Sequence, residues 1–276
     1  MGDNQDGISC CNDPQHAFLY LFVIYLAIVL VTWDTIISKP MRLLATSIHE
    51  MSHALACWIS CGEVRAIEVY NNEGGVTKYV GGCRCLIVPA GYLGEAFWGM
   101  VFVVLSGGRK TSTAAAGGLI FALLFCLCYA PNRVLVILNT CYATITLAFI
   151  FVEWFLFTPI LAYVVLLYGV FLGTYAIFDI FGHLIVRSNP QSDAYALYEE
   201  SGRCFPPRCV GVYWLVLAIL FQLVGIWLTL ILMSDECEDL GWFECVFDSR
   251  FELDMNEFEW WPDDWDWPDD WSFNKD

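Results

Sequence analysis

The sequence has few charged residues, and basic residues are the scarcest of them. Charged residues make up 16% of the 276-residue chain, against about 25% in an ordinary soluble domain. Lys and Arg together number 13, while the net charge is −17. Binding to nucleic acid needs clustered Lys and Arg that neutralise phosphate groups. The composition therefore argues against nucleic acid as a partner.

Signals for secretion, N-myristoylation and a cysteine zinc site are also lacking, whereas palmitoylation of Cys10 and Cys11 stays open. The first 16 residues contain acids but no Lys or Arg, so they do not resemble a secretory signal. The sixth residue is Asp, where a myristoylation signal has Ser or Thr. The chain has 13 cysteines, and none of those in its polar connections is accompanied by histidine or a second close pair at zinc-finger spacing.

Apolar residues are abundant and occur in long runs. Hydrophobic residues make up 58% of the chain, and its mean hydropathy is +0.57. Runs of about 17–25 apolar residues are long enough to cross a bilayer as helices. The sequence thus predicts an all-α polytopic membrane protein with seven spans, and alternatives of six or eight stay open. The predicted spans are 17–37, 41–60, 86–105, 114–130, 134–153, 158–182 and 212–233.

One segment between two predicted spans has a different pattern. Residues 62–85 place Val and Tyr on both sides of an Asn-Asn-Glu-Gly-Gly turn, with Ile67 before it, which predicts a β-hairpin or small sheet. At membrane depth, such a hairpin needs its backbone polar groups satisfied by protein or water. We expect it at an interface or beside a cavity.

The chain divides into three predicted parts, of which the last is strongly acidic. A polar segment (1–16) precedes the membrane domain (17–233), and residues 234–276 form a tail. The tail has 16 acids against Arg250 and Lys275, a net charge of −14. Repulsion between these acids predicts a disordered, solvated tail. The alternative is a segment whose six tryptophans bind the membrane interface or a protein partner.

Two histidines lie four residues apart in the second predicted span, within TSIHEMSHALACWISCG (46–62). Residues four apart share one face of a helix, so His49 and His53 can offer ring nitrogens to one metal ion. Glu50 lies beside that face and can accept a proton from an activated water, as in the HExxH zinc peptidases. Ionisable residues in a span are costly and indicate function. Hydrogen bonding across a polar bundle interior is the alternative.

Catalytic zinc usually has three protein ligands, so a third is expected from elsewhere in the chain. Asp179 and His183 stand out because they lie four apart at the end of a long apolar run. Asp179 would complete a site of two histidines and one carboxylate, and His183 is expected to support the site more than to bind the metal directly. The other candidates in or beside apolar runs are Asp34, Glu95 and Glu153.

Four stretches together resemble the site-2 protease family of intramembrane zinc metallopeptidases, in its small, single-domain branch. The first is His49-Glu-x-x-His53 in an apolar helix, and the second is the glycine-containing β segment GGVTKYVGG (74–82). The third is PAGYLGEAFWG (89–99), and the fourth is FDIFGHLIVRSNPQSDA (178–194). The resemblance covers residues 40–195.

This resemblance implies a zinc-dependent endopeptidase, embedded in the lipid bilayer, that cleaves membrane-spanning protein substrates. It implies that His49, His53 and Asp179 hold zinc and that Glu50 activates water. Two positions depart from the family pattern: Ile180 follows Asp179 where Gly is usual, and Glu95 stands where a small residue is usual.

Two other classes of function remain as alternatives. One is a metal-binding membrane scaffold or chaperone without peptidase activity, and the other is a transporter. The intact Glu50 favours the peptidase, because a pure binding site has no use for a general base. The sequence also has no internal repeat of the kind that transporters often contain.

Overall fold

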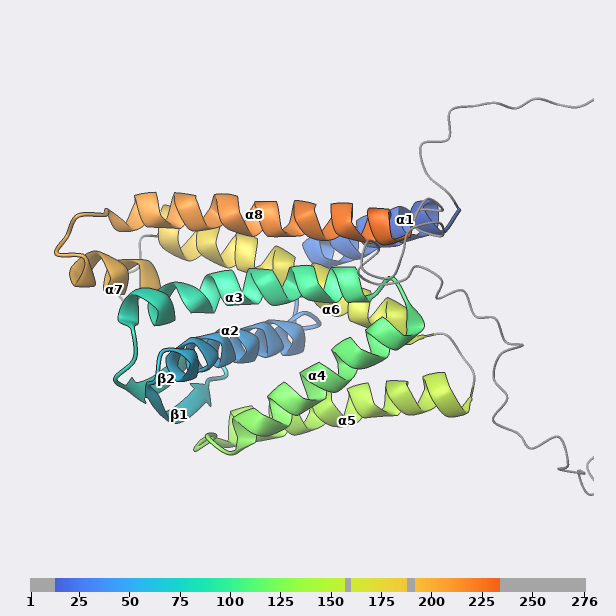
Figure 1. The fold of residues 1–276 in the computed structure, drawn as a ribbon, viewed down its shortest axis with the longest axis horizontal. Helices are drawn as coiled ribbons and strands as arrows, with labels where there is room; N and C mark the ends of the chain where they lie inside the picture. The colour runs from blue at the N-terminus through green and yellow to red at the C-terminus, as the bar shows by residue number, and fades with distance from the viewer. Residues whose placement is uncertain (1–12, 157–159, 188–191, 234–276) are drawn as a thin grey trace, which may run out of the picture.

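The apolar runs of the sequence form long helices that pack side by side, with a two-stranded sheet and a short helix at one end of the bundle (Figure 1). The computed structural model describes residues 13–156, 160–187 and 192–233. The elements are α1 (Asp13–Thr32), α2 (Lys39–Ile59), β1 (Glu63–Val69), β2 (Gly75–Val80), α3 (Arg84–Leu105), α4 (Arg109–Leu127), α5 (Arg133–Phe155), α6 (Leu161–Asp179), the π-helix η1 (Ile180–Val186), α7 (Asp193–Glu200) and α8 (Pro207–Leu232).

Six helical segments are long and apolar enough to cross a membrane, which confirms the prediction of a polytopic membrane protein. They are α1, α3, α4, α5, α6 continued by η1, and α8. The remaining long helix, α2, is less apolar because it carries His49, Glu50 and His53. It packs against α3, α5, α6 and the sheet. Neighbouring helices therefore cover the polar face that lipid would penalise.

The predicted hairpin is present as an antiparallel pair of strands. Val64 pairs with Tyr79 and Val69 with Gly75, with an irregularity in register after Val64. The outer edge of β1 is closed by the α4–α5 connection, since the Ile67 amide donates to the Tyr129 carbonyl oxygen at 2.9 Å. The protein thus supplies hydrogen-bond partners on one side of the hairpin.

The turn of the hairpin is fixed to the N-terminal half of α2. Glu73, which has a positive φ of 67°, forms an ion pair with Arg42 at 2.9 Å. The Thr46 hydroxyl donates to the Glu73 carbonyl oxygen at 3.1 Å. These contacts hold the start of β2 against the turn of α2 that carries Glu50.

Close packing of α3 on α6 forms the centre of the bundle. A Cβ atom added at Gly99 would lie 2.6 Å from the backbone nitrogen of Gly173, so a larger residue cannot occupy this crossing without displacing backbone. Small residues allow such an approach between membrane helices. The α3–α6 pair provides a rigid frame beside α2.

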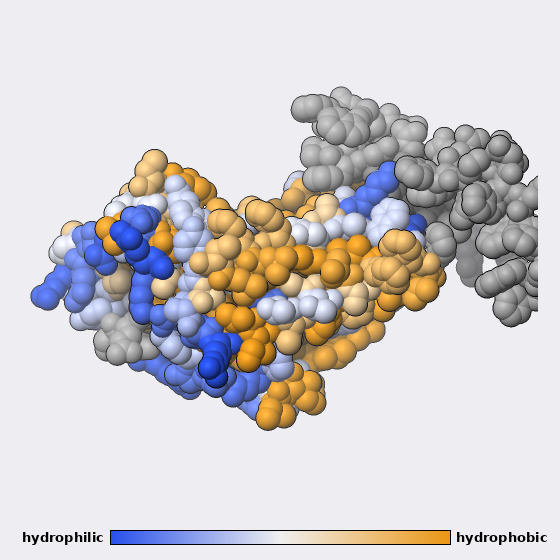
Figure 2. Space-filling view, turned by 90° about the horizontal axis from the view of Figure 1, so that it is seen from below, coloured by the Kyte–Doolittle hydropathy of each residue, from blue (hydrophilic) through white to orange (hydrophobic). Residues whose placement is uncertain are grey.

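The surface divides along the long axis of the molecule. In Figure 2, hydrophobic residues cover much of the middle and right of the visible face, and hydrophilic residues gather at the left end. This is the end at which Figure 1 places the hairpin and α7. The arrangement agrees with a bundle that spans a bilayer and has a polar end at one of its boundaries. The tail (234–276) and residues 1–12 lie outside the described residues.

Candidate metal centre

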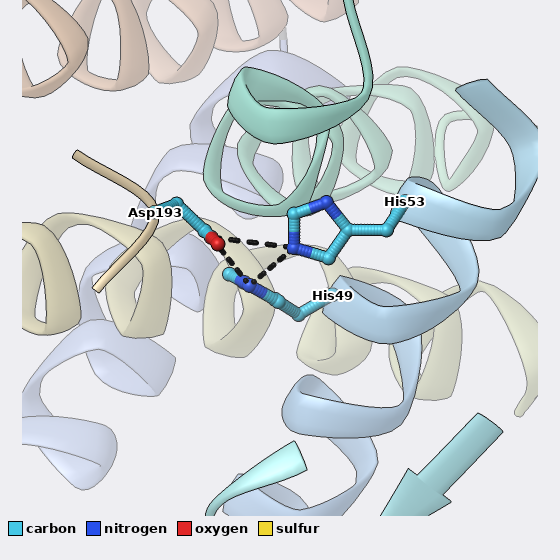
Figure 3. Close-up of side chains that lie close together, drawn as sticks. All are labelled: His49, His53 and Asp193. Atoms are coloured by element: carbon cyan, nitrogen blue, oxygen red, sulfur yellow. Dashed lines mark hydrogen bonds and ion pairs between the residues drawn. The ribbon is translucent and has the colours of Figure 1, made fainter. Parts of the chain in front are cut away.

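His49 and His53 project from one face of α2 toward the first residue of α7 (Figure 3). Their Nε2 atoms are 3.1 Å apart. Oδ2 of Asp193 lies 3.3 Å from the Nε2 atom of His49 and 3.2 Å from that of His53. Three potential ligand atoms, two nitrogens and one oxygen, therefore form a nearly equilateral triangle.

The size and chemistry of this triangle fit a zinc ion. Three atoms bound to one tetrahedral zinc at about 2.0–2.2 Å lie about 3.3–3.5 Å from one another, close to the observed spacing. Nδ1 of His53 is 2.7 Å from the Ile87 carbonyl oxygen, which can only accept a hydrogen bond. Nδ1 therefore carries the proton, and Nε2 directs a lone pair at the triangle. Two histidines and a carboxylate are a common ligand set of catalytic zinc.

Gly91 on α3 has no side chain and so makes room for the rings of His49 and His53. A Cβ atom at this position would lie 2.4 Å from the Nε2 atoms of both His49 and His53. The rings are held from other sides as well, since Tyr92 meets the His49 ring edge-on at a centroid distance of 4.6 Å. The glycine thus lets α3 pass close to the face of α2 that bears the ligands.

We expect Gly91→Ala to weaken zinc binding by about 10-fold or more, because the added methyl group displaces both ligand rings. Competition with a chromophoric chelator measures the affinity. Gly118→Ala on α4 is the matched control, because nothing lies within 4 Å of a Cβ at Gly118. Equal zinc affinity of the two variants would contradict the placement of the ion.

Asp193 reaches the histidines because α7 packs against α3, the helix that lies beside the histidines of α2. It is the first residue of α7, which packs on α3 and α8. Burial raises the pKa of Asp193, but the charges and hydrogen bonds of His53 and His49 in their protonated form outweigh this and hold the pKa below its usual range. A metal ion bound in place of those protons would act on the carboxylate in the same direction. The carboxylate form, which is the form that binds metal, is therefore favoured at this position.

Asp179 and His183 do not join the triangle. They form an ion pair with each other, with Nδ1 of His183 2.5 Å from Oδ1 of Asp179. The π-helix η1 follows Asp179 directly and keeps the two side chains together on one face. Among the described residues, the group of His, Cys, Asp and Glu side chains that could hold a metal consists of His49, His53 and Asp193. The geometry thus favours Asp193 over Asp179 as the third residue of a candidate metal site.

The other carboxylates considered as ligands have different surroundings. Glu153 forms an ion pair with Arg109 at 3.0 Å, and its other oxygen accepts the backbone amide of Ile160 at 2.8 Å, which caps the start of α6. Asp34 lies in the turn between α1 and α2. Glu95 lies behind His49, with 3.7 Å between its Oε2 and Nδ1 of the histidine. None of the three belongs to the triangle.

Glu50 lies beside the triangle and is buried, with 5% of its surface exposed. Oε2 of Glu50 is 2.7 Å from the Thr77 hydroxyl on β2. A Cβ atom at Gly75 would lie 2.5 Å from the other carboxylate oxygen, so β2 approaches Glu50 closely at this glycine. The hairpin therefore fixes the orientation of the carboxylate.

A cavity of about 350 Å³ connects these groups. It extends from the histidines to β2 on one side and to the Asp179–His183 pair on another, and Tyr92 and Tyr175 contribute aromatic walls. Water and an extended peptide could both enter a space of this kind between the sheet and the helices.

Comparison with protein families identifies the group to which these features belong. The family model described as Peptidase M50B-like matches residues 22–229, which is most of the chain. The chain belongs to this family. The M50B-like match covers every element from α2 to α7 and thus all three residues of the triangle, His49, His53 and Asp193. Searches of curated proteins and of solved structures gave no match.

Membership confirms the resemblance to site-2 proteases and the assignment as an integral, multi-pass membrane protein. M50 peptidases are metallopeptidases and are in general zinc-dependent, which agrees with the ligand types in this M50B-like chain. At the coarse level, the chain is a member of a membrane metallopeptidase family.

Sequence reasoning did not single out Asp193 as a ligand. It lies in the polar connection after the long apolar segment, where an acid is usually solvated. A signal was present, because Ser192-Asp193-Ala194 ends the fourth stretch of the family resemblance. The restriction of candidates to apolar runs and their borders excluded this residue.

Proposed function

We propose that this M50B-like chain is a zinc-dependent endopeptidase that hydrolyses peptide bonds in membrane-spanning segments of other proteins. The observation that carries the proposal is the triangle of His49, His53 and Asp193 beside the buried carboxylate of Glu50. A scaffold that only binds metal needs the three ligands but has no use for Glu50.

In this mechanism, His49, His53 and Asp193 hold the metal, and a bound zinc ion would supply Lewis-acid activation of water and of the scissile carbonyl group. Glu50 accepts a proton from the attacking water and delivers it to the nitrogen of the leaving amine. Thr77 donates a hydrogen bond to Oε2 of Glu50, which leaves Oε1 free to take that proton. The buried setting strengthens each of these electrostatic interactions.

The placement of the site supports a substrate that lies in the membrane. The ligands belong to α2, which packs among the apolar spans, and the cavity opens between these helices and the hairpin. The backbone carbonyl groups of a transmembrane helix are hydrogen-bonded within the helix and thus shielded. The substrate must therefore unwind near the scissile bond before it is cleaved.

An unwound segment can bind by adding a strand to β2. The outer edge of β1 contacts the α4–α5 connection, whereas β2 lines the cavity through Gly75, Val76 and Thr77. Strand addition supplies main-chain hydrogen bonds independent of sequence. Such pairing would hold an extended backbone next to Glu50.

We expect a photo-crosslinking residue at Val76 to capture substrate in a Glu50→Gln background, in which bound substrate persists. The same residue at Arg65 on β1 is the control, because its side chain is exposed away from the cavity lining. Capture is read by mass shift of the full chain in native membranes. Equal capture at the two positions would contradict docking along β2.

Parallel measurements of zinc content and of cleavage in wild type and Glu50→Gln test the function as a whole. Retained zinc with lost cleavage supports the peptidase, whereas unchanged cleavage removes Glu50 from the mechanism.

A further inference from the structure

Glu95 is a buried carboxylate that the mechanism described so far does not use. It lies on α3, a membrane-spanning helix, with none of its surface exposed. Within the described part of the chain, neither carboxylate oxygen has a hydrogen-bond partner. An ionisable side chain in a bilayer-spanning helix costs free energy, and such residues generally mark functional sites.

The polar atom that Glu95 faces belongs to the metal centre. Its Oε2 is 3.7 Å from Nδ1 of His49, which is ion-pair range but longer than a hydrogen bond. The opposite ring nitrogen, Nε2, is the one that points to His53 and Asp193. Glu95 therefore contacts the metal triangle through the back of one ligand.

The spacing along α3 places Glu95 and Gly91 on the same helical face. Residues four apart lie one above the other. Gly91 makes room beside the Nε2 atoms, and Glu95, one turn further along, lies at the other side of the same His49 ring. One face of α3 thus shapes both sides of the ligand.

The position of Glu95 behind His49 can be explained by the charge of a bound metal ion. A dication held by two neutral imidazoles and one carboxylate has a net charge of about +1, which is expensive in an apolar interior. A carboxylate behind a ligating histidine offsets that charge, and its negative field favours the tautomer with the proton on Nδ1, which leaves the Nε2 lone pair for the metal.

We propose that Glu95 is a positioning residue that holds His49 for metal binding and supplies a counter-charge to the bound ion. This inference rests on the proposed metal centre. It extends the centre beyond the three ligands to a residue where the family pattern has a small side chain.

The test uses the full chain in detergent micelles, with zinc as the probe and a chromophoric chelator as competitor. We expect the dissociation constant for zinc to rise about 10-fold in Glu95→Gln, which keeps the shape but not the charge, and up to about 100-fold in Glu95→Leu. Glu153→Gln is the matched control, because Glu153 is a buried carboxylate of the same bundle that pairs with Arg109 instead of a ligand.

Two further measurements separate positioning from a purely structural role. Glu95 has no hydrogen-bond partner among the described residues, and replacement of a buried charged group by an apolar residue of similar volume is often neutral or stabilising, so metal-free Glu95→Leu should melt at or above the wild-type temperature. The visible absorption bands of the cobalt-substituted protein should shift in Glu95→Gln and stay unchanged in Glu153→Gln. Of these two glutamates, only Glu95 contacts a residue of the metal triangle, His49, so only its replacement changes the surroundings of the metal.

The outcomes distinguish this inference from the proposed function. If wild type binds zinc no better than His53→Ala, the metal centre itself is overturned, and Glu95 loses its role with it. If wild type binds zinc, His53→Ala does not, and Glu95→Leu binds as wild type does, only the role of Glu95 is overturned. Weaker zinc binding that accompanies an equal loss of metal-free stability, with an unshifted cobalt spectrum, also overturns it.

Discussion

Asp193→Asn is expected to lower zinc affinity by more than about 100-fold, beyond the ~10–100-fold typical for loss of an outer hydrogen-bond partner. The substitution keeps the size of the side chain but removes the only anionic atom of the triangle, Oδ2, which is 3.2–3.3 Å from the two Nε2 atoms. The purified protein should then contain little zinc, measured by inductively coupled plasma mass spectrometry against protein concentration.

Asp179→Asn is the control for this experiment. Asp179 lines the same cavity, but it pairs with His183 and not with the histidines of α2. The zinc content of Asp179→Asn should equal that of wild type. The reverse pattern, with zinc retained in Asp193→Asn and lost in Asp179→Asn, would restore the ligand that the sequence suggested.

Glu50→Gln is expected to slow cleavage by orders of magnitude while zinc stays bound. A general base contributes about 10²–10⁴-fold to the rate, so kcat/KM should fall by that factor, or about 2.7–5.5 kcal/mol of transition-state stabilisation. The amide can still accept the hydrogen bond of Thr77 and fits against Gly75, so the surroundings of the site are preserved. Only the ability to accept a proton is lost.

Glu63→Gln is the matched control, because this glutamate lies on β1 with an exposed side chain paired to Arg65. The Glu63→Gln variant should cleave substrate as fast as wild type does. Zinc loss in Glu50→Gln would show that Glu50 supports binding, and activity within a few-fold of wild type would exclude it as the base.

Local patterns were sufficient to predict much of the fold and two of the three residues of the candidate metal group. The His49–His53 pair could be recognised because helix periodicity is a property of short segments, and Glu50 follows from the same motif. The hairpin was predicted from its glycine-rich turn, and the structure contains it at Glu63–Val80. Apolar runs predicted the spans for the same reason: hydropathy is read residue by residue.

The third ligand could not be predicted in this way. Asp193 reaches the triangle only because α7 packs back onto α3, which is a contact between segments far apart in the chain. Asp179, at the end of a long apolar helix, looked better placed until the structure showed its pairing with His183. Glu95 was noticed as a departure from the family pattern, but its relation to His49 depends on how α3 crosses α2.

The status of α2 shows a second limit of hydropathy. The sequence predicted it as one of seven spans, whereas the six helices that qualify by length and composition do not include it. Its polar face is buried against neighbouring helices, so its own hydropathy does not report its surroundings. A helix that carries ionisable residues inside a bundle is weakly apolar for this reason.

The most direct test of an intramembrane peptidase is a comparison of membrane-protein fragments in cells that express wild type or Glu50→Gln at equal levels. Mass spectrometry of new chain termini identifies the cleavage sites directly, so no substrate has to be chosen in advance. Wild type should produce termini inside predicted transmembrane segments, and these should be absent with Glu50→Gln although that variant retains zinc. Identical sets of termini in the two samples would contradict the proposed peptidase activity.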